Sequence, residues 1–228
     1  WVAAVQPMAL SYKAGALFRM GKGREAAFAF SKTFASAPAS QKKNIFLGFL
    51  WATDRCNPNL IESYSNMATH PQEKALLTGM FGLYGTAPHS HIIEKTFLLD
   101  ENCNVLPLLV QREINKIEEK YLTPKLSKQP GSKTFYYTWN DQDSSLLSNA
   151  ELLQTLTLLE KMASHPTAAH RDMYATGAAY LSYLIQDAAR TRTNVALAKK
   201  MSPGIAISDQ LQLIALLLQS SEIKNMDA

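Results

Sequence analysis

The chain has 228 residues, of which 46% are hydrophobic and 18% are charged, so it can bury a substantial core and is not a disordered protein. Its formal net charge is only +4, and the basic residues are scattered among glutamates, which argues against a nucleic-acid-binding protein. No apolar run reaches the length of about 18 residues that a membrane-spanning helix requires, and no secretory signal peptide is recognisable.

Residues 10–38 predict two amphipathic helices that fold against one another. Small and apolar residues recur at steps of three and four in each half, which is the spacing of one helix face; they are Leu10, Ala14, Leu17, Ala26, Ala27, Phe30 and Phe34. Gly21 and Gly23 separate the two halves, because glycine weakens a helix interior and tolerates the positive φ of a turn. Pro38 ends the second half, since proline cannot continue a helix.

This arrangement resembles the tetratricopeptide repeat, a helix–turn–helix unit of about 34 residues. With Pro7 as the first position, the residues that match the family's small, glycine, alanine, aromatic and closing proline positions are Ala14, Gly21, Ala26, Phe30 and Pro38. The positions where the family usually has tryptophan, tyrosine and a late alanine hold Leu10, Leu17 and Thr33. The match covers residues 7–40, and the remainder is similar only in its succession of helical pairs.

The apolar segment 1–6 is expected to be the tail of a preceding helix, and the chain after Pro38 to continue as further helices. A capping residue or a proline marks most of their starts, and apolar residues follow at helical spacing. The expected helices span about 40–55, 58–67, 71–84, 88–100, 105–122, 148–164, 168–189, 193–201 and 208–218. The buried stripe of the first is predicted to be Ile45, Phe49, Ala52 and Cys56.

The segment 105–122 has the most regular pattern of these helices. Its predicted buried stripe consists of Leu106, Val110, Ile114, Ile117 and Tyr121. Its charged residues are expected on the solvent-exposed face, and they are Arg112, Glu113, Lys116, Glu119 and Lys120.

Residues 123–145 are expected to form a long loop, because they contain Pro124, Pro130 and Gly131 and lack a helical pattern. Long loops inside compact helical domains are often functional, and tyrosine and tryptophan are enriched at binding hot spots. One interpretation therefore makes this loop a contact site for a partner protein, through Lys133, Phe135, Tyr136, Tyr137 and Trp139. The other has the same aromatic side chains fold back over a gap between helices.

Motifs for catalysis and metal binding are weak. Neither the pair His89 and His91 nor the pair His165 and His170 has a third ligand nearby, although zinc needs three or four. Gly21–Arg24 lacks the spacing of a phosphate-binding loop. Glu118 and Glu119, neighbours in a helix, point about 100° apart and are expected on the surface. Cys56 and Cys103 fit no metal spacing, and whether they form a disulfide is left open. We expect no catalytic residue, metal or cofactor site.

The sequence thus predicts an all-α fold, an α-solenoid of ten or eleven helices in antiparallel pairs with one long loop at 123–145. We expect a single repeat domain over 1–228, or two parts, 1–122 and 146–228, around the loop. Because the chain starts at Trp1 without a methionine and ends abruptly at Ala228, we expect it to be part of a longer protein.

The resemblance implies a non-catalytic scaffold that binds a peptide or a partner protein on the concave face of stacked helices. It also favours a bacterial periplasm or cell envelope over the cytoplasm. The alternative is a helical accessory domain of an enzyme whose catalytic part lies outside this chain. Nucleic acid is not an expected partner, and the oligomeric state is open.

Overall fold

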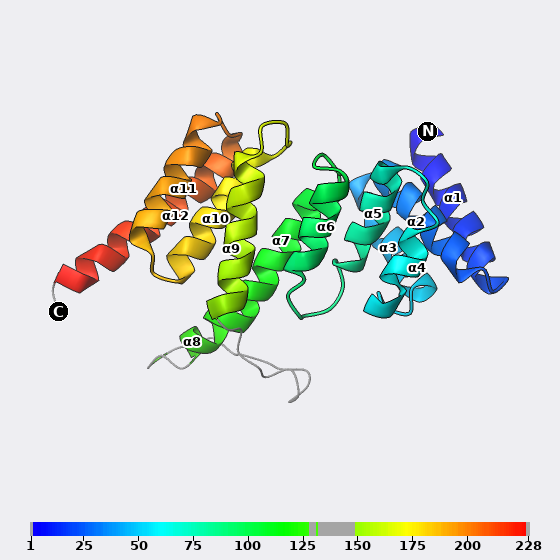
Figure 1. The fold of residues 1–228 in the computed structure, drawn as a ribbon, viewed down its shortest axis with the longest axis horizontal. Helices are drawn as coiled ribbons and strands as arrows, with labels where there is room; N and C mark the ends of the chain where they lie inside the picture. Colours follow the sequence, from blue (N-terminus) through cyan, green and yellow to red (C-terminus); the bar gives the residue numbers. More distant parts are fainter. Residues whose placement is uncertain (1, 128–130, 132–148, 227–228) are drawn as a thin grey trace. The chain divides into compact units, whose positions relative to one another are not determined.

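The computed structural model describes residues 2–127, 131 and 149–226, and these ranges contain helices and no β-strand (Figure 1). The predicted all-α class is therefore confirmed. None of the helices in these ranges combines the length and the hydropathy that crossing a membrane requires. The chain divides into two compact units, residues 1–109 and 110–228, which are described separately.

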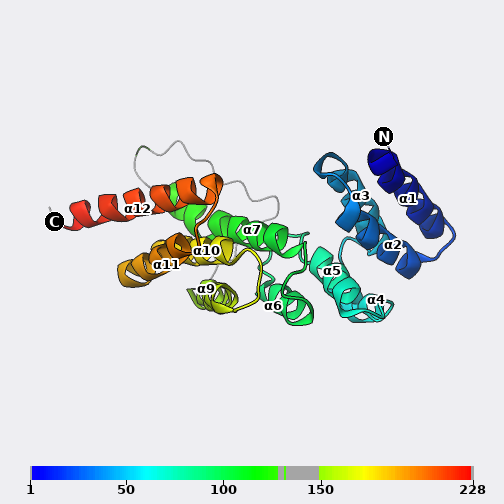
Figure 2. The ribbon, with the colours of Figure 1, turned by 90° about the horizontal axis from the view of Figure 1, so that it is seen from above.

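The first unit is built around α2 (Figures 1 and 2). Its elements are α1 (Val2–Arg19), α2 (Gly23–Ser36), α3 (Ala39–Ala52), the 3-10 turn η1 (Pro58–Leu60), α4 (Ile61–Ser65), α5 (Pro71–Phe81), α6 (Ser90–Leu99) and the start of α7 (Leu106–Ile117). Helix α2 packs against α1, α3 and α5, while α1 also contacts α3 and α5 packs against α6.

The predicted helix–turn–helix over residues 10–38 is confirmed. Helix α1 ends in a Schellman motif, in which the Lys22 amide donates to the Leu17 carbonyl and the Gly21 amide to the Phe18 carbonyl, both at 3.0 Å. Gly21 has φ +75°, the left-handed conformation that glycine adopts without strain. The predicted core residues Ala14, Ala26, Ala27, Phe30 and Phe34 are buried.

Helix α1 differs from the prediction at both ends of its pattern. The segment before Pro7 is not the tail of another helix but the start of α1 itself, with Pro7 inside it. Pro7 lies beyond the first turn, where proline removes one backbone hydrogen bond of the helix, and α1 nevertheless continues through it. Leu10 was expected to face inward, but it is exposed, as is Met20 just after the last residue of the helix.

Aromatic packing fills the core between α2, α3 and α5. All four residues of the stripe predicted for the helix over about 40–55 are buried, and they are Ile45, Phe49, Ala52 and Cys56. The Phe49 ring meets the Phe81 ring edge-on at a centroid distance of 5.4 Å. Gly48 of α3 lies against the Phe30 ring so closely that a Cβ atom there would come within 2.4 Å of it. The lack of a side chain at Gly48 therefore sets how near α3 comes to α2.

The second unit is built around α10. Its elements are the rest of α7, the π-helical turn η2 (Glu118–Leu122), α8 (Thr123–Ser127), α9 (Asn149–Ser164), α10 (Arg171–Leu184), α11 (Ala188–Lys200) and α12 (Ile205–Met226). Helix α10 packs against α9, α11 and α12. It can be enclosed on several sides because small residues, Ala175, Gly177, Ala178 and Ala179, form much of its buried surface.

Three expectations for this unit are corrected. The helix expected over 168–189 ends at Leu184, because Gln186 adopts φ +63° in a second Schellman motif and Asp187 then caps α11. The loop was expected from residue 123, but Thr123–Ser127 form α8, with Pro124 in its first turn, where proline is tolerated. The helix over 105–122 forms, but its last turn is π-helical.

Candidate protein-binding surface

The loop residues predicted to contact a partner, Lys133, Phe135, Tyr136, Tyr137 and Trp139, lie outside the described residues. Both interpretations of them remain predictions.

The histidine and cysteine candidates do not form a site in the described part of the chain. The His89 and His91 rings meet edge-on with centroids 5.8 Å apart, and the described residues contain no group of three metal ligands. Cys56 and Cys103 are both reduced and buried. His170 has φ +56° and stands at the start of α10.

The charged face predicted for residues 105–122 is largely wrong. Glu113, Lys116 and Lys120 are buried, and the Lys116 ammonium lies 3.5 Å from the Glu113 carboxylate in an ion pair one helical turn apart. Glu118 was expected to be solvated, but its carboxylate accepts a hydrogen bond of 2.9 Å from the Tyr180 hydroxyl. The periodic pattern failed here because it identifies the charged face of a helix but not whether other parts of the chain cover that face.

A polar cluster joins α9, α10 and α11 in the second unit. Arg190 donates to both Glu160 carboxylate oxygens at 2.7 and 2.6 Å, and the Asn194 amide donates to Glu160 at 2.9 Å and to the Ser182 hydroxyl at 3.3 Å. The hydrogen bonds from Arg190 are the largest cause of a lowered Glu160 pKa. These groups satisfy one another, so we interpret the cluster as a structural element that ties the three helices together.

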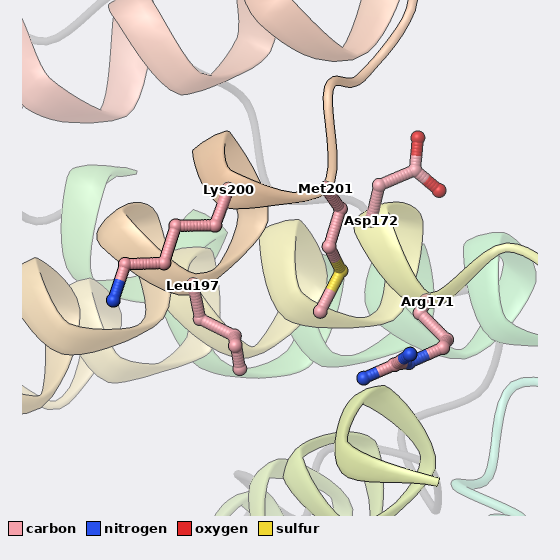
Figure 3. Close-up of a pocket in the computed structure, with 5 residues that line it drawn as sticks. All are labelled: Arg171, Asp172, Leu197, Lys200 and Met201. Atoms are coloured by element: carbon pink, nitrogen blue, oxygen red, sulfur yellow. The ribbon is translucent and has the colours of Figure 1, made fainter. Parts of the chain in front are cut away.

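A pocket of about 580 Å³ opens in the second unit between the start of α10 and the end of α11 (Figure 3). The Met201 side chain lies between the ends of Arg171 and Lys200, and the Asp172 carboxylate points away from both. The Arg171 Nε also donates to the Ala163 carbonyl at 2.8 Å. Because the charged groups do not converge on one point, this arrangement lacks the geometry of a catalytic centre.

A smaller pocket of about 320 Å³ lies in the first unit beside the Lys32–Glu73 ion pair, whose charged atoms are 2.7 Å apart. Cys103 lines it, and burial raises the pKa of the Cys103 thiol to about 11. A thiol with a raised pKa is a poor nucleophile at neutral pH. This pocket therefore offers a buried thiol rather than a reactive one.

The solvent-facing side of α1 is unusual because it exposes several apolar side chains. Ala14 and Pro7 face the core, whereas Val5, Met8 and Tyr12, at steps of three and four, are exposed, Tyr12 by 73%. This spacing places the three side chains on one stripe roughly opposite Ala14. We call these three residues the α1 stripe.

A second pair of exposed apolar side chains lies on α3, the helix that contacts α1. Leu47 and Trp51 are four residues apart and therefore on one face of α3, and Trp51 is exposed by 66%. Soluble proteins rarely leave such large side chains exposed in groups, and such groups mark binding sites when they occur.

The charges of α1 and of the turn after it are all positive, and the first acidic residue of the chain is Glu25 in α2. The segment 2–24 contains the basic residues Lys13, Arg19, Lys22 and Arg24 and no acidic residue, and these four account for the whole net charge of +4. All four side chains are exposed. The expectation that the basic residues are scattered among glutamates is thus wrong for this part of the chain.

The sequence contains a signal that identifies this surface. Apolar residues lie on both sides of α1, and a helix that is apolar all round is normally covered on both sides. The repeat pattern marks only the face that carries Ala14, and the exposed face was missed for that reason.

No family model, no curated protein and no solved structure matches this chain.

Proposed function

We propose that this protein is a non-catalytic interaction module, a tetratricopeptide-like stack of antiparallel helix pairs that binds an amphipathic helix of a partner protein on the α1 stripe. The observation that carries the proposal is the exposure of Val5, Met8 and Tyr12 on one side of a helix whose other side is packed in the core.

The energetic argument rests on apolar area. Burying a fully exposed methionine side chain stabilises a complex by about 1.5–3 kcal/mol, and Met8, which is 49% exposed, contributes about half of that. Tyrosine and tryptophan are the residue types most enriched among binding hot spots, and Tyr12 and Trp51 are the most exposed aromatic side chains of α1 and α3. The α1 stripe therefore combines apolar area with a residue type common at hot spots, and α3 exposes a second aromatic side chain of this kind.

A helix is the occupant that fits the shape of this surface. An α-helix of 18 residues such as α1 is about 27 Å long, which is long enough for several turns of a second helix to lie along it. Ala9 and Ala16 are exposed on the same side as the α1 stripe. Small residues between larger ones let a second helix approach to the usual interaxial distance of about 8–10 Å.

The test is a selection of helical peptides from a displayed library on the immobilised chain, followed by affinity measurements on the selected peptides. The variant Met8→Glu/Tyr12→Glu places charges on the α1 stripe, and we expect it to weaken binding by at least about tenfold, or 1.4 kcal/mol. The matched control is Leu98→Glu, because Leu98 is an exposed apolar residue on α6. We expect this control to bind as the wild type does.

Circular dichroism melting of each variant shows whether its fold is intact. The proposal is wrong if no peptide is enriched, or if the selected peptides bind Met8→Glu/Tyr12→Glu as tightly as the wild type. It is also wrong if light scattering shows that the α1 stripe joins two copies of the chain, with the double variant monomeric.

A further inference from the structure

We infer that the partner helix is acidic, with carboxylate side chains beside its apolar face. This inference rests on the proposed function and names the chemistry of the partner at the same surface.

The first argument is the position of the charges relative to the α1 stripe. Arg19 is seven residues after Tyr12, so it continues the line of Val5 and Tyr12 toward the end of α1. Lys13 lies about 100° from Tyr12 and flanks the stripe. The surface therefore changes along its length from apolar near Val5 to basic near Arg19.

The second argument is that these cations have no carboxylate of their own. None of Lys13, Arg19, Lys22 and Arg24 takes part in an ion pair within the described ranges. By contrast, Lys32 on the next helix is 2.7 Å from Glu73, and Arg190 in the second unit is 2.6 Å from Glu160. Exposed basic groups of one sign attract an acidic partner and repel a basic one, which supplies specificity and speeds association.

Helix α3 has the same sign of charge. It contains Lys42 and Lys43 and no acidic residue. The Lys42 ammonium lies over the Phe34 ring at 4.8 Å from its centroid, which holds that side chain against the unit. Lys43 is exposed and lies four residues before Leu47, on the face that also carries Trp51. Both helices thus pair an apolar stripe with basic residues alone.

An anionic membrane surface shares this chemistry, but α1 does not have the form of a membrane-surface helix. Such helices present a strongly charged polar face to water opposite their apolar face. The side of α1 opposite the α1 stripe is packed in the core through Pro7 and Ala14. We therefore favour a protein helix, and lipid binding is an outcome of the test.

The experiment compares two synthetic peptides by fluorescence anisotropy with the full chain. Both carry the apolar residues of a peptide selected in the display experiment, and they differ only in having glutamate or lysine at the flanking positions. We expect the glutamate peptide to bind at least about tenfold more tightly, and to lose affinity as salt rises from about 50 to 500 mM, because exposed charges are screened. We expect Lys13→Glu/Arg19→Glu to reverse the preference.

Lys199→Glu/Lys200→Glu is the matched control, since it removes two exposed basic residues from the end of α11 and should leave the preference unchanged. If both peptides bind the wild type equally and Met8→Glu/Tyr12→Glu abolishes binding, the inference fails while the proposed function stands. If neither peptide binds, the proposed function fails. If Lys13→Glu/Arg19→Glu still binds the glutamate peptide more tightly, then Lys13 and Arg19 are not the residues that recognise the acidic partner, and the inference is wrong. Sedimentation with vesicles of anionic lipid, in the absence of peptide binding, would overturn both.

Discussion

Arg190 holds Glu160 by two short hydrogen bonds, one to each carboxylate oxygen, and such bidentate pairs are among the strongest hydrogen bonds in proteins. Asn194 adds a third bond to the same carboxylate and is itself buried. Since Glu160 lies on α9 while Arg190 and Asn194 lie on α11, one carboxylate joins two helices that are far apart in the sequence.

Glu160→Gln is expected to lower the free energy of unfolding by about 1–2 kcal/mol at neutral pH, because the charged hydrogen bonds are lost and the pair is partly exposed. The folded pKa of Glu160 lies below its usual value of 4.5. The stabilisation is therefore present above about pH 4.5 and is lost as the pH falls through the folded pKa. Urea unfolding at neutral and acidic pH measures both effects. A constant difference between variant and wild type across this range would contradict the assignment.

Cys103 is expected to react slowly with iodoacetamide in the folded protein. Burial raises the pKa of its thiol from 9.0 to about 11, so the thiolate fraction is about 100-fold lower at a given pH than in the unfolded chain. The measurement is the alkylation rate in a Cys56→Ala variant, with and without urea. The same shift means that the contribution of Cys103 to stability is complete below pH 9 and is lost as the pH rises toward 11. Equal alkylation rates in both states would show that the thiol is accessible.

At the scale of the helix, Gly15 and Gly48 both lie inside an α-helix, but only Gly48 is in close contact with another side chain. Gly48 lies in α3 against Phe30, with ring atoms 2.4 Å from a Cβ built on it, whereas nothing lies within 4 Å of a Cβ at Gly15 of α1. Replacing either glycine by alanine increases helix propensity by the same amount. The close contact with Phe30 therefore decides how the two replacements differ in their effect on stability.

We expect Gly48→Ala to lower the free energy of unfolding by about 1–3 kcal/mol, because the buried Phe30 ring must move. Gly15→Ala is expected to raise it by about 0.5–1 kcal/mol, since it removes only conformational freedom of the unfolded chain. Denaturant unfolding of the two variants side by side tests the packing of α2 and α3. A stabilising Gly48→Ala would mean that α3 is not held against Phe30.

The ends of α1 and α10 show which helix ends can be predicted from the local sequence and which cannot. The end of α1 was predictable because glycine at position 21 is the residue type that a Schellman motif favours. The end of α10 was missed because Gln186 takes the same conformation, and glutamine carries no such signal. Asp187, whose carboxylate accepts from the Arg190 amide at 2.9 Å, was the available sign that a new helix begins there.

At the scale of the molecule, the α1 stripe should be dispensable for folding. Met8→Gln/Tyr12→Gln is expected to change the free energy of unfolding by less than about 0.5 kcal/mol, because both side chains are exposed. It should also reduce binding of a hydrophobic dye. Calorimetry and dye fluorescence measure the two effects. A loss of several kcal/mol would show that the stripe belongs to the core instead of the surface.

The helical class, the turn at Gly21 and the core faces of α2 and α3 were predictable from the residues alone, because periodicity, glycine and proline act over a few residues. The burial of Glu113, Lys116 and Lys120 and the exposure of the α1 stripe were not, and they emerged from the folded structure. A pattern of apolar and charged residues shows which residues share one face of a helix. Which face is covered depends on the elements that pack against it, and those come from distant parts of the chain.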